Sequence, residues 1–349
     1  MVQGKNGLDR SDHSASVSSE NTSSGEIEVS RLACPPADSP RTRAHGCCGR
    51  CSRATDGGMS VSAVSSTRQP AANALSVDVE DYFQVRSFAD RIALSSWDSY
   101  ETRFGRNTRE LLELFQRYNA KATFFVLGWN AQKDPDLVKE IARDGHEIAS
   151  HGWSHTLVYQ LTPSQFREEV VRTKFLLEDI SGTPVLGFRA PSYSITTRSL
   201  WALEVLAEAG HLYDSSIYPI WRRVYGIASA ERNPHFTKAG SKEIVEFPMS
   251  TARVGKWNVP FGSGAYLRLM PLYLTRVLIS RHNRRGLPAN VSVHPWEIDP
   301  DQPRVRSLVE RPNHYLGLGR TRSVLEALLG IFRFDPVRDV LENLALLLA

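Results

Sequence analysis

The chain has 349 residues, and 41% of them are hydrophobic, which is enough to bury a sizeable core in one large domain or two small ones. Its formal net charge of +4 at pH 7 is only mildly basic for this length. We therefore do not expect nucleic acid as a partner.

Residues 1 to 72 differ in composition from the rest of the chain. They are rich in Ser, Thr, Gly, Asp and Arg and lack any sustained apolar periodicity, which predicts a disordered, low-complexity tail. The tail has no continuous apolar stretch of seven or more residues, so we expect neither a secretory signal nor a membrane anchor in it. With no transmembrane segment expected, the predicted location is cytoplasmic or peripheral to the membrane.

The tail also holds all four cysteines, which are Cys34, Cys47, Cys48 and Cys51. They could bind zinc in principle, but without a second C-x-x-C pair we do not expect a structural zinc site. The cysteine-free remainder uses no disulfides, which fits a reducing compartment. Met59 is an alternative start of the protein, and native peptides from residues 1 to 58 would contradict that start.

Strand-like and helix-like segments alternate from Asn73 onward. Apolar runs predict strands at 73–79, 122–127, 146–150, 185–188, 243–248 and 289–294, and helical spacing predicts helices at 107–118, 135–144, 163–180, 197–209, 270–281, 321–332 and 336–348. The stretch 221–261 is less regular. The alternation predicts a parallel barrel or a doubly wound sheet, with candidate site residues at the ends of strands.

Three acids follow the first predicted strand: Asp78, Glu80 and Asp81. An ionised carboxylate that leaves water costs several kcal/mol unless it is paired or bound to a metal, so acids at the end of a core strand are candidate site residues. Asp78 and Glu80 share one strand face by period two, whereas Asp81 could join them only if the strand ends there.

His151 and His155 lie four residues apart, directly after the strand predicted at 146–150. On one side of a helical turn, two imidazoles at this spacing can converge on a single cation. The preceding strand would place His151 at a carboxyl end, where α/β barrels have their active sites. Taken alone, the pair could equally be two surface histidines, and a metal site needs a carboxylate from elsewhere in the chain.

Five motifs in order resemble those of the NodB-homology polysaccharide deacetylases, carbohydrate esterase family 4. They are Asp78-Val79-Glu80-Asp81, Ser150-His151-Gly152-Trp153-Ser154-His155, Arg189-Ala190-Pro191-Ser192-Tyr193, Tyr213-Asp214-Ser215-Ser216 and Val293-His294-Pro295-Trp296-Glu297. The chain most resembles the branch associated with exosortase-linked exopolysaccharide clusters. The resemblance covers roughly residues 73 to 345 and implies a distorted (β/α) barrel, with a C-terminal helical extension from about residue 260.

The resemblance also implies a metal site. His151 and His155 would be ligands of a divalent ion, expected to be Zn²⁺ with Co²⁺ or Ni²⁺ as alternatives. The family's usual pair of adjacent aspartates is absent because Val79 follows Asp78. The third ligand is therefore Glu80 or Asp81, and Glu80 is favoured because it shares a strand face with Asp78.

The same resemblance assigns the catalytic roles. Asp78 would be the general base and His294 the acid that protonates the leaving amine. Arg189 would orient Asp78 and hold it ionised, and Asp214 would keep His294 protonated. A backbone N–H near Tyr193 would help to stabilise the oxyanion.

Aromatic residues are candidates for binding sugar rings, namely Tyr193, Trp153, Trp257 and Trp296. The sequence thus predicts a metal-dependent hydrolase that removes N-acetyl groups from an amino-sugar polysaccharide, expected to be an exopolysaccharide. Two alternatives stay open: hydrolysis of another C–N bond, in a cyclic imide or ureide, and a catalytically inactive carbohydrate-binding protein. The sequence does not predict the oligomeric state.

Overall fold

The computed structural model describes residues 72–89, 91–305 and 314–347. The tail predicted to be disordered, its four cysteines and Met59 lie outside this part of the chain. Within it, no helix is both long and apolar enough to cross a bilayer.

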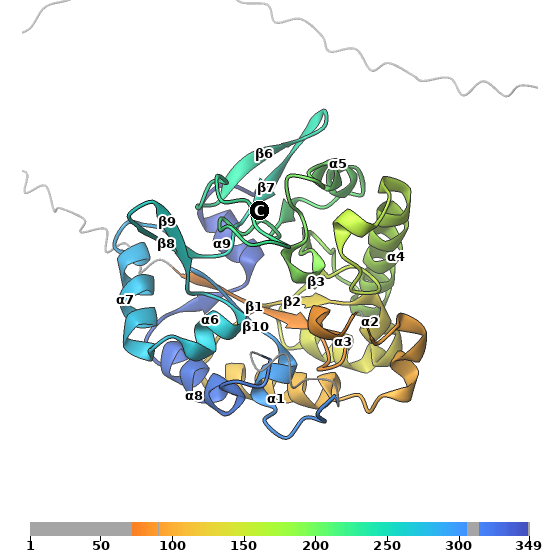
Figure 1. Cartoon of the computed structure of the whole chain (residues 1–349), viewed down its shortest axis with the longest axis horizontal. Helices are drawn as coiled ribbons and strands as arrows, with labels where there is room; N and C mark the ends of the chain where they lie inside the picture. The colour runs from red at the N-terminus through yellow and green to blue at the C-terminus, as the bar shows by residue number, and fades with distance from the viewer. Residues whose placement is uncertain (1–71, 90, 306–313, 348–349) are drawn as a thin grey trace, which may run out of the picture. The chain divides into compact units, whose positions relative to one another are not determined.

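A curled, mostly parallel sheet forms the centre of the fold (Figure 1). Its strands run in the order β10-β1-β2-β3-β4-β5-β7-β6, and β11 also pairs with β1. The strands are β1 (Asn73–Val79), β2 (Thr123–Val126), β3 (Glu147–Ser150), β4 (Gly187–Phe188), β5 (Tyr213–Asp214), β6 (His235–Ala239), β7 (Lys242–Glu246), β10 (Asn290–Val293) and β11 (Phe334–Asp335). Only the β6–β7 pair within this sheet is antiparallel.

Helices and short 3₁₀ turns surround the sheet (Figure 1). The α-helices are α1 (Phe104–Arg117), α2 (Gly128–Lys133), α3 (Pro135–Arg143), α4 (Pro163–Ser181), α5 (Trp201–Glu208), α6 (Gly264–Leu269), α7 (Leu272–Asn283), α8 (Leu318–Leu329) and α9 (Val337–Asn343). The 3₁₀ turns are η1 (Arg86–Phe88), η2 (Leu94–Ser99), η3 (Val158–Gln160), η4 (Pro191–Tyr193) and η5 (Pro295–Ile298). Because helices cover the sheet, every residue of β1, β2, β3 and β10 is buried, as expected for apolar parallel strands.

The register of β1 explains how distant motifs meet. Val77 pairs with Val293 of β10 on one side and with Phe124 of β2 on the other. The carboxyl ends of these parallel strands therefore lie together, and Asp78 and His294 leave the sheet at the same edge. This edge is where barrels of this kind hold their sites.

Loop segments cover the outer edge of β10 without forming a regular ladder. The backbone N–H of Ser292 donates to the Gly262 carbonyl at 2.8 Å, and that of Asn290 donates to Ser250 Oγ at 2.7 Å. These contacts curl the sheet toward closure and confirm the predicted distorted (β/α) barrel. Because β10 and β11 both pair with β1, the segment after residue 260 contributes strands to the sheet as well as helices.

The irregular stretch 221–261 holds two hairpins. One is the β6–β7 pair, and the other is formed by β8 (Thr251–Val254) and β9 (Trp257–Pro260), which make a separate two-stranded sheet. Sequence periodicity missed β6, β8 and β9 because their side chains are partly exposed on both faces. The predicted strand 185–188 is reduced to the two residues of β4.

Candidate active site

Glu80, His151 and His155 converge at the carboxyl end of the sheet. Glu80 Oε1 lies 3.0 Å from Nε2 of His151 and 2.9 Å from Nε2 of His155. All three side chains are buried. Two imidazole nitrogens and one carboxylate oxygen within 4.8 Å of one another form a group with the composition of a catalytic metal site.

Hydrogen bonding fixes the tautomer of His151. Its Nδ1 lies 2.8 Å from the Arg189 carbonyl oxygen, which can only accept, so Nδ1 carries the proton. With an uncharged ring, Nε2 then directs its lone pair toward Glu80. A backbone carbonyl that holds the far nitrogen in this way is the usual second contact of a histidine that binds a metal. The residues present therefore fit a divalent ion.

The electrostatics of Glu80 are consistent with this arrangement, whereas those of His151 favour its protonated form, so a bound ion would have to displace that proton. Burial alone would raise the pKa of Glu80, but His155, His294 and His151 together hold that pKa well below its usual value. Burial likewise acts to lower the pKa of His151, and the carboxylates of Glu80 and Asp78 outweigh it and raise that pKa. The cluster therefore keeps Glu80 ionised, as a ligand must be.

The two histidines do not lie on a helical turn, so that expectation was wrong. Residues 151–157 form an irregular loop, with φ of +74° at Gly152 and +55° at His155. Backbone bonds to α2 anchor this loop: Gly128 N donates to the Gly152 carbonyl at 2.9 Å, and Trp129 N donates to the Trp153 carbonyl. Left-handed backbone at a histidine costs free energy and is found at functional sites.

Asp78 pairs with Arg189 inside the barrel. Arg189 Nη1 donates to Asp78 Oδ1 at 2.6 Å, and both side chains are buried. The same guanidinium donates to Ser76 Oγ, Ser292 Oγ and Ser215 Oγ, so serines on three sides hold it in place. This bond fixes the orientation of the Asp78 carboxylate and leaves Oδ2 directed toward His294.

His294 faces this carboxylate from the end of β10. Its Nε2 lies 3.6 Å from Asp78 Oδ2 and 4.0 Å from Glu80 Oε1. Burial lowers its pKa, and the carboxylates of Glu80 and Asp78 oppose that shift. Asp78, Arg189 and His294 thus lie beside the histidine–carboxylate cluster, as their motifs predicted.

Asp81 lies apart from the cluster. Its carboxylate accepts backbone N–H bonds from Arg103 at 2.6 Å, Phe104 at 2.9 Å and Tyr82 at 2.8 Å. These bonds place it at the N-terminus of α1, where a carboxylate satisfies free backbone donors. Burial raises the pKa of Asp81 to about 6. Glu80, rather than Asp81, is the acid that meets the imidazoles.

Asp214 does not contact His294, which contradicts the expected pairing. It accepts a hydrogen bond from Ser216 Oγ at 2.5 Å and shares a side-chain hydrogen bond with the buried Glu246. Burial raises the pKa of Asp214 to about 6 and that of Glu246 well above its usual value. The nearest carboxylate to the distal nitrogen of His294 is that of Glu297, with Nδ1 and Oε2 3.2 Å apart.

Glu297 was missed as a site residue although it belongs to the quoted His294 motif. Its Oε2 also accepts the His294 backbone N–H at 3.0 Å, and its Oε1 pairs with the buried Arg268 of α6. The signal for Glu297 was its i+3 spacing from His294, which forms a capping box at the start of η5. Arg268 gave no comparable signal, because α6 was not predicted.

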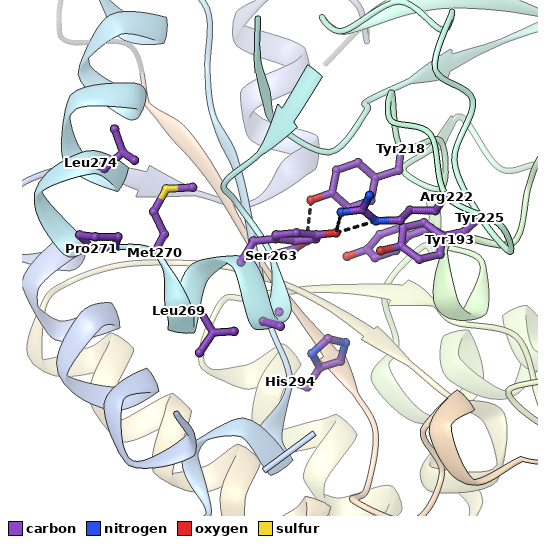
Figure 2. Close-up of a pocket in the computed structure, with 13 residues that line it drawn as sticks. Tyr193, Tyr218, Arg222, Tyr225, Ser263, Leu269, Met270, Pro271, Leu274 and His294 are labelled. Atoms are coloured by element: carbon purple, nitrogen blue, oxygen red, sulfur yellow. Dashed lines mark hydrogen bonds between the residues drawn. The ribbon is translucent and has the colours of Figure 1, made fainter. Parts of the chain in front are cut away.

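A pocket of about 810 Å³ opens beside His294 (Figure 2). One wall carries Tyr193, Tyr218, Tyr225 and Arg222. The other is apolar and comes from α6, α7 and the two residues between them, with Leu269, Met270, Pro271 and Leu274. Tyr193 lines this pocket, and its role in substrate binding stays a prediction. Its backbone N–H already donates to the Ala190 carbonyl at 3.0 Å, so the expected oxyanion donor is engaged within the chain.

The three tryptophans proposed for sugar binding do not line this pocket. Trp153 is buried against Gly128 and beneath the guanidinium of Arg172, because it anchors the histidine loop to α2 and α4. Trp296 stacks on His294 with ring centroids 5.3 Å apart and supports that ring from behind. Trp257 is 63% exposed on the β8–β9 hairpin.

The fold and the cluster together define the class of protein: an α/β barrel with a candidate histidine–carboxylate metal site and an acid–base pair at the carboxyl ends of its strands. Comparisons with known proteins agree. Residues 88–211 match the sequence profile described as "Polysaccharide deacetylase", and residues 215–342 match a second profile, described as "Domain of unknown function (DUF3473)". Over residues 88–211 the chain is therefore similar to the NodB-homology polysaccharide deacetylases, carbohydrate esterase family 4, which agrees with the motif resemblance.

The chain matches individual curated relatives over only part of its length. The chain is 34% identical over 114 residues to a peptidoglycan-N-acetylglucosamine deacetylase of Bacillus cereus, which is 32% of this chain and 40% of that protein. It is 30% identical over 107 residues to a peptidoglycan deacetylase of Helicobacter pylori, 31% of this chain and 36% of that one. The chain therefore spans less than half the length of these curated relatives.

Solved structures share the fold. A crystal structure from Mycobacterium smegmatis, assigned as a polysaccharide deacetylase, superimposes with a TM-score of 0.52 at 22% identity, over 79% of this chain and 94% of that one. A second, from Pseudomonas aeruginosa, gives a TM-score of 0.52 at 16% identity, over 78% of this chain and 89% of that one. The narrower exosortase-linked branch stays a prediction.

Proposed function

We propose that this protein is a metal-dependent hydrolase that removes N-acetyl groups from an amino-sugar polysaccharide. The observation that carries the proposal is the convergence of Glu80, His151 and His155 within 3.0 Å contacts, directly beside the Asp78–Arg189 pair and His294. A general base, a general acid and a ligand set thus share one buried edge of the barrel. The deacetylase profile supports the reaction class.

Glu80, His151 and His155 would hold the ion, and Zn²⁺ is the ion we propose because two imidazoles and one carboxylate suit catalytic zinc, with Co²⁺ or Ni²⁺ as alternatives. When bound, the ion supplies Lewis-acid polarisation of the acetamide carbonyl. The remaining steps depend on side chains of this chain. Arg189 orients Asp78 through a 2.6 Å hydrogen bond, so that Asp78 can accept a proton from the attacking water.

His294 is placed to complete the reaction. It faces the same edge as Asp78 and lines the pocket, so it can donate a proton to the amine nitrogen as the C–N bond breaks. The products are acetate and a free amino sugar. Glu297 accepts the backbone N–H of His294 at 3.0 Å and lies 3.2 Å from its distal nitrogen, so we assign it as a positioning residue that holds the backbone at His294.

The substrate class follows from the pocket and from the family. Tyrosine rings on one wall, among them Tyr193, give flat faces on which sugar rings can stack. We propose an exopolysaccharide as substrate on the strength of the motif resemblance. The curated relatives act on peptidoglycan according to their names, so peptidoglycan fragments are the comparison substrate.

The test is acetate release from N-acetylglucosamine oligomers by the full chain, first treated with a chelator and then supplied with Zn²⁺, Co²⁺ or Ni²⁺. We expect activity only after metal is restored. Asp78→Asn should lower kcat by about a thousandfold or more, because the base is lost. His155→Ala should abolish metal-restored activity, and His235→Ala, on the distant strand β6, is the matched control that should retain it.

Two results would contradict the proposal. The metal-dependent mechanism would be wrong if acetate were still released after treatment with the chelator. It would also be wrong if Asp78→Asn released acetate at the rate of the unaltered chain. Hydrolysis of a cyclic imide or ureide without acetate release would redirect the same residues to another C–N bond.

A further inference from the structure

The segment between β7 and η5 has an unusual charge composition. From Phe247 to Trp296 the sequence contains no Asp or Glu, whereas the 38 acids of the 349-residue chain would give about five in 50 residues. The same segment contains seven basic residues: Arg253, Lys256, Arg268, Arg276, Arg281, Arg284 and Arg285. Arg268 is buried and paired with Glu297, and the other six are exposed. The modest net charge of the whole chain conceals this local excess.

Large apolar side chains are exposed among these cations. On α7, Tyr273 is 75% exposed, and Leu274 and Val277 are also exposed. On the β8–β9 hairpin, Val254 and Trp257 are exposed. Helical spacing places Tyr273, Val277 and Arg284 along one face of α7, so apolar and basic side chains share the outward face of this helix.

Contacts join these elements into one surface. A small cavity is lined by Arg253 of β8, by Arg281 of α7 and by Arg285 in the turn after α7, so the hairpin and the helix are neighbours, as Figure 1 also shows. Asn258 Nδ2 of β9 donates to the Pro219 carbonyl at 2.7 Å, which ties the hairpin to the segment that carries the 72% exposed Trp221. We call the exposed residues of α7, of the β8–β9 hairpin and Trp221 the basic–apolar face.

The basic–apolar face borders the pocket. Leu274 is exposed on α7 and also lines the pocket wall, opposite Arg222 (Figure 2). Within the described ranges, the guanidinium groups of Arg276, Arg281, Arg284 and Arg285 have no carboxylate within ion-pairing distance. The basic–apolar face thus combines these four arginines with exposed apolar side chains, and it borders the pocket through Leu274.

We propose that the basic–apolar face docks this protein onto the surface of an anionic phospholipid membrane. Phosphate headgroups would neutralise the arginines, and the exposed Tyr, Trp, Val and Leu side chains would enter the interfacial layer. Trp and Tyr favour this layer because they combine an apolar ring with a polar group. A polyanion without an apolar phase, such as nucleic acid or an acidic polysaccharide, would leave Val254, Leu274 and Val277 in water.

The test is flotation of the full chain with vesicles of phosphatidylcholine alone or with roughly one third phosphatidylglycerol. We expect binding to the anionic vesicles and weaker binding at high salt. Arg276→Glu/Arg284→Glu should weaken binding by about tenfold or more by reversing two charges. Tyr273→Ser/Val277→Ser should weaken it by about tenfold without changing the charge. Arg143→Glu on α3 and Phe175→Ser on α4 are the matched controls, and both should bind as the unaltered chain does.

The outcomes separate this proposal from the catalytic one. Both double variants should release acetate from soluble oligomers at the rate of the unaltered chain, because none of the four residues lines the pocket. Asp78→Asn should bind vesicles normally even though it is inactive. The docking face would be overturned if the chain did not bind vesicles, or if both double variants bound them as well as the unaltered chain does. It would also be overturned if DNA displaced the chain from vesicles while Tyr273→Ser/Val277→Ser had no effect on binding.

Discussion

Removal of the Arg189 side chain should destabilise the barrel mainly by stranding the Asp78 carboxylate. The two groups are buried and 2.6 Å apart, and loss of one partner from a buried ion pair costs about 3–5 kcal/mol. Arg189→Met is therefore expected to lower the free energy of unfolding by about that amount. Part of this loss comes from the serine hydroxyls that also bind Arg189, so the single variant does not isolate the pair.

A double-mutant cycle isolates it. Arg189→Met, Asp78→Asn and the double variant would be unfolded in urea with a chelator present, so that no bound ion adds to stability. The double variant should be more stable than the sum of the single effects implies, by at least about 2 kcal/mol. The control cycle uses Arg109 and Asp134, which are partly exposed and 3.0 Å apart, and should give less than about 1 kcal/mol. Additivity within about 0.5 kcal/mol at Arg189 and Asp78 would refute the reasoning.

Two further predictions concern the carboxylates and a buried histidine. Glu80→Gln should weaken Zn²⁺ binding, measured by calorimetry, by about a hundredfold or more. Asp81→Ala should leave Zn²⁺ binding within about threefold and instead lower the free energy of unfolding by about 1–2 kcal/mol, because Asp81 caps α1. The reverse pattern would make Asp81 the ligand. Burial lowers the pKa of His211 from 6.5 to about 3. As the pH falls, His211 therefore takes up a proton in the unfolded chain before it does so in the folded one. The free energy of unfolding that this group contributes above pH 6.5 is lost as the pH falls toward 3. Between pH 7 and 5.5 the loss from this group is about 1 kcal/mol, and His211→Phe should remove it from the urea midpoints; an unchanged pH dependence would contradict the assignment.

The sequence predicted the barrel because the buried strands β1, β2, β3 and β10 are recognisable as apolar runs and the helices carry clear end signals. Thr162 and Gln165 form a capping box at the start of α4, and Gly182 ends that helix with φ of +66°. Such signals are local, so they can be read from neighbouring residues alone. The short strands β4 and β5 and the hairpins in 221–261 depend on contacts with distant segments, and periodicity could not locate their bounds.

The candidate site was predictable where a motif lies at the end of a buried strand. Asp78, His151 and His294 leave parallel strands at one edge, and the fold alone brings them together. The directions in which the side chains of Trp153 and Asp214 point were predicted wrongly. Trp153 turns into the core and Asp214 turns toward Glu246, because packing decides which face a loop residue presents. Spacing in the sequence carries no information on that choice.

The position of β1 in the sheet has a consequence for synthesis of the protein. This strand carries Asp78 and leads directly to Glu80, yet its ladder partners include β10 and β11, which come from the far end of the chain. During synthesis, one edge of β1 therefore stays unpaired until β10 has been translated, and more than two hundred residues separate the two strands. The candidate site therefore cannot be assembled until β10 and His294 have also been synthesised.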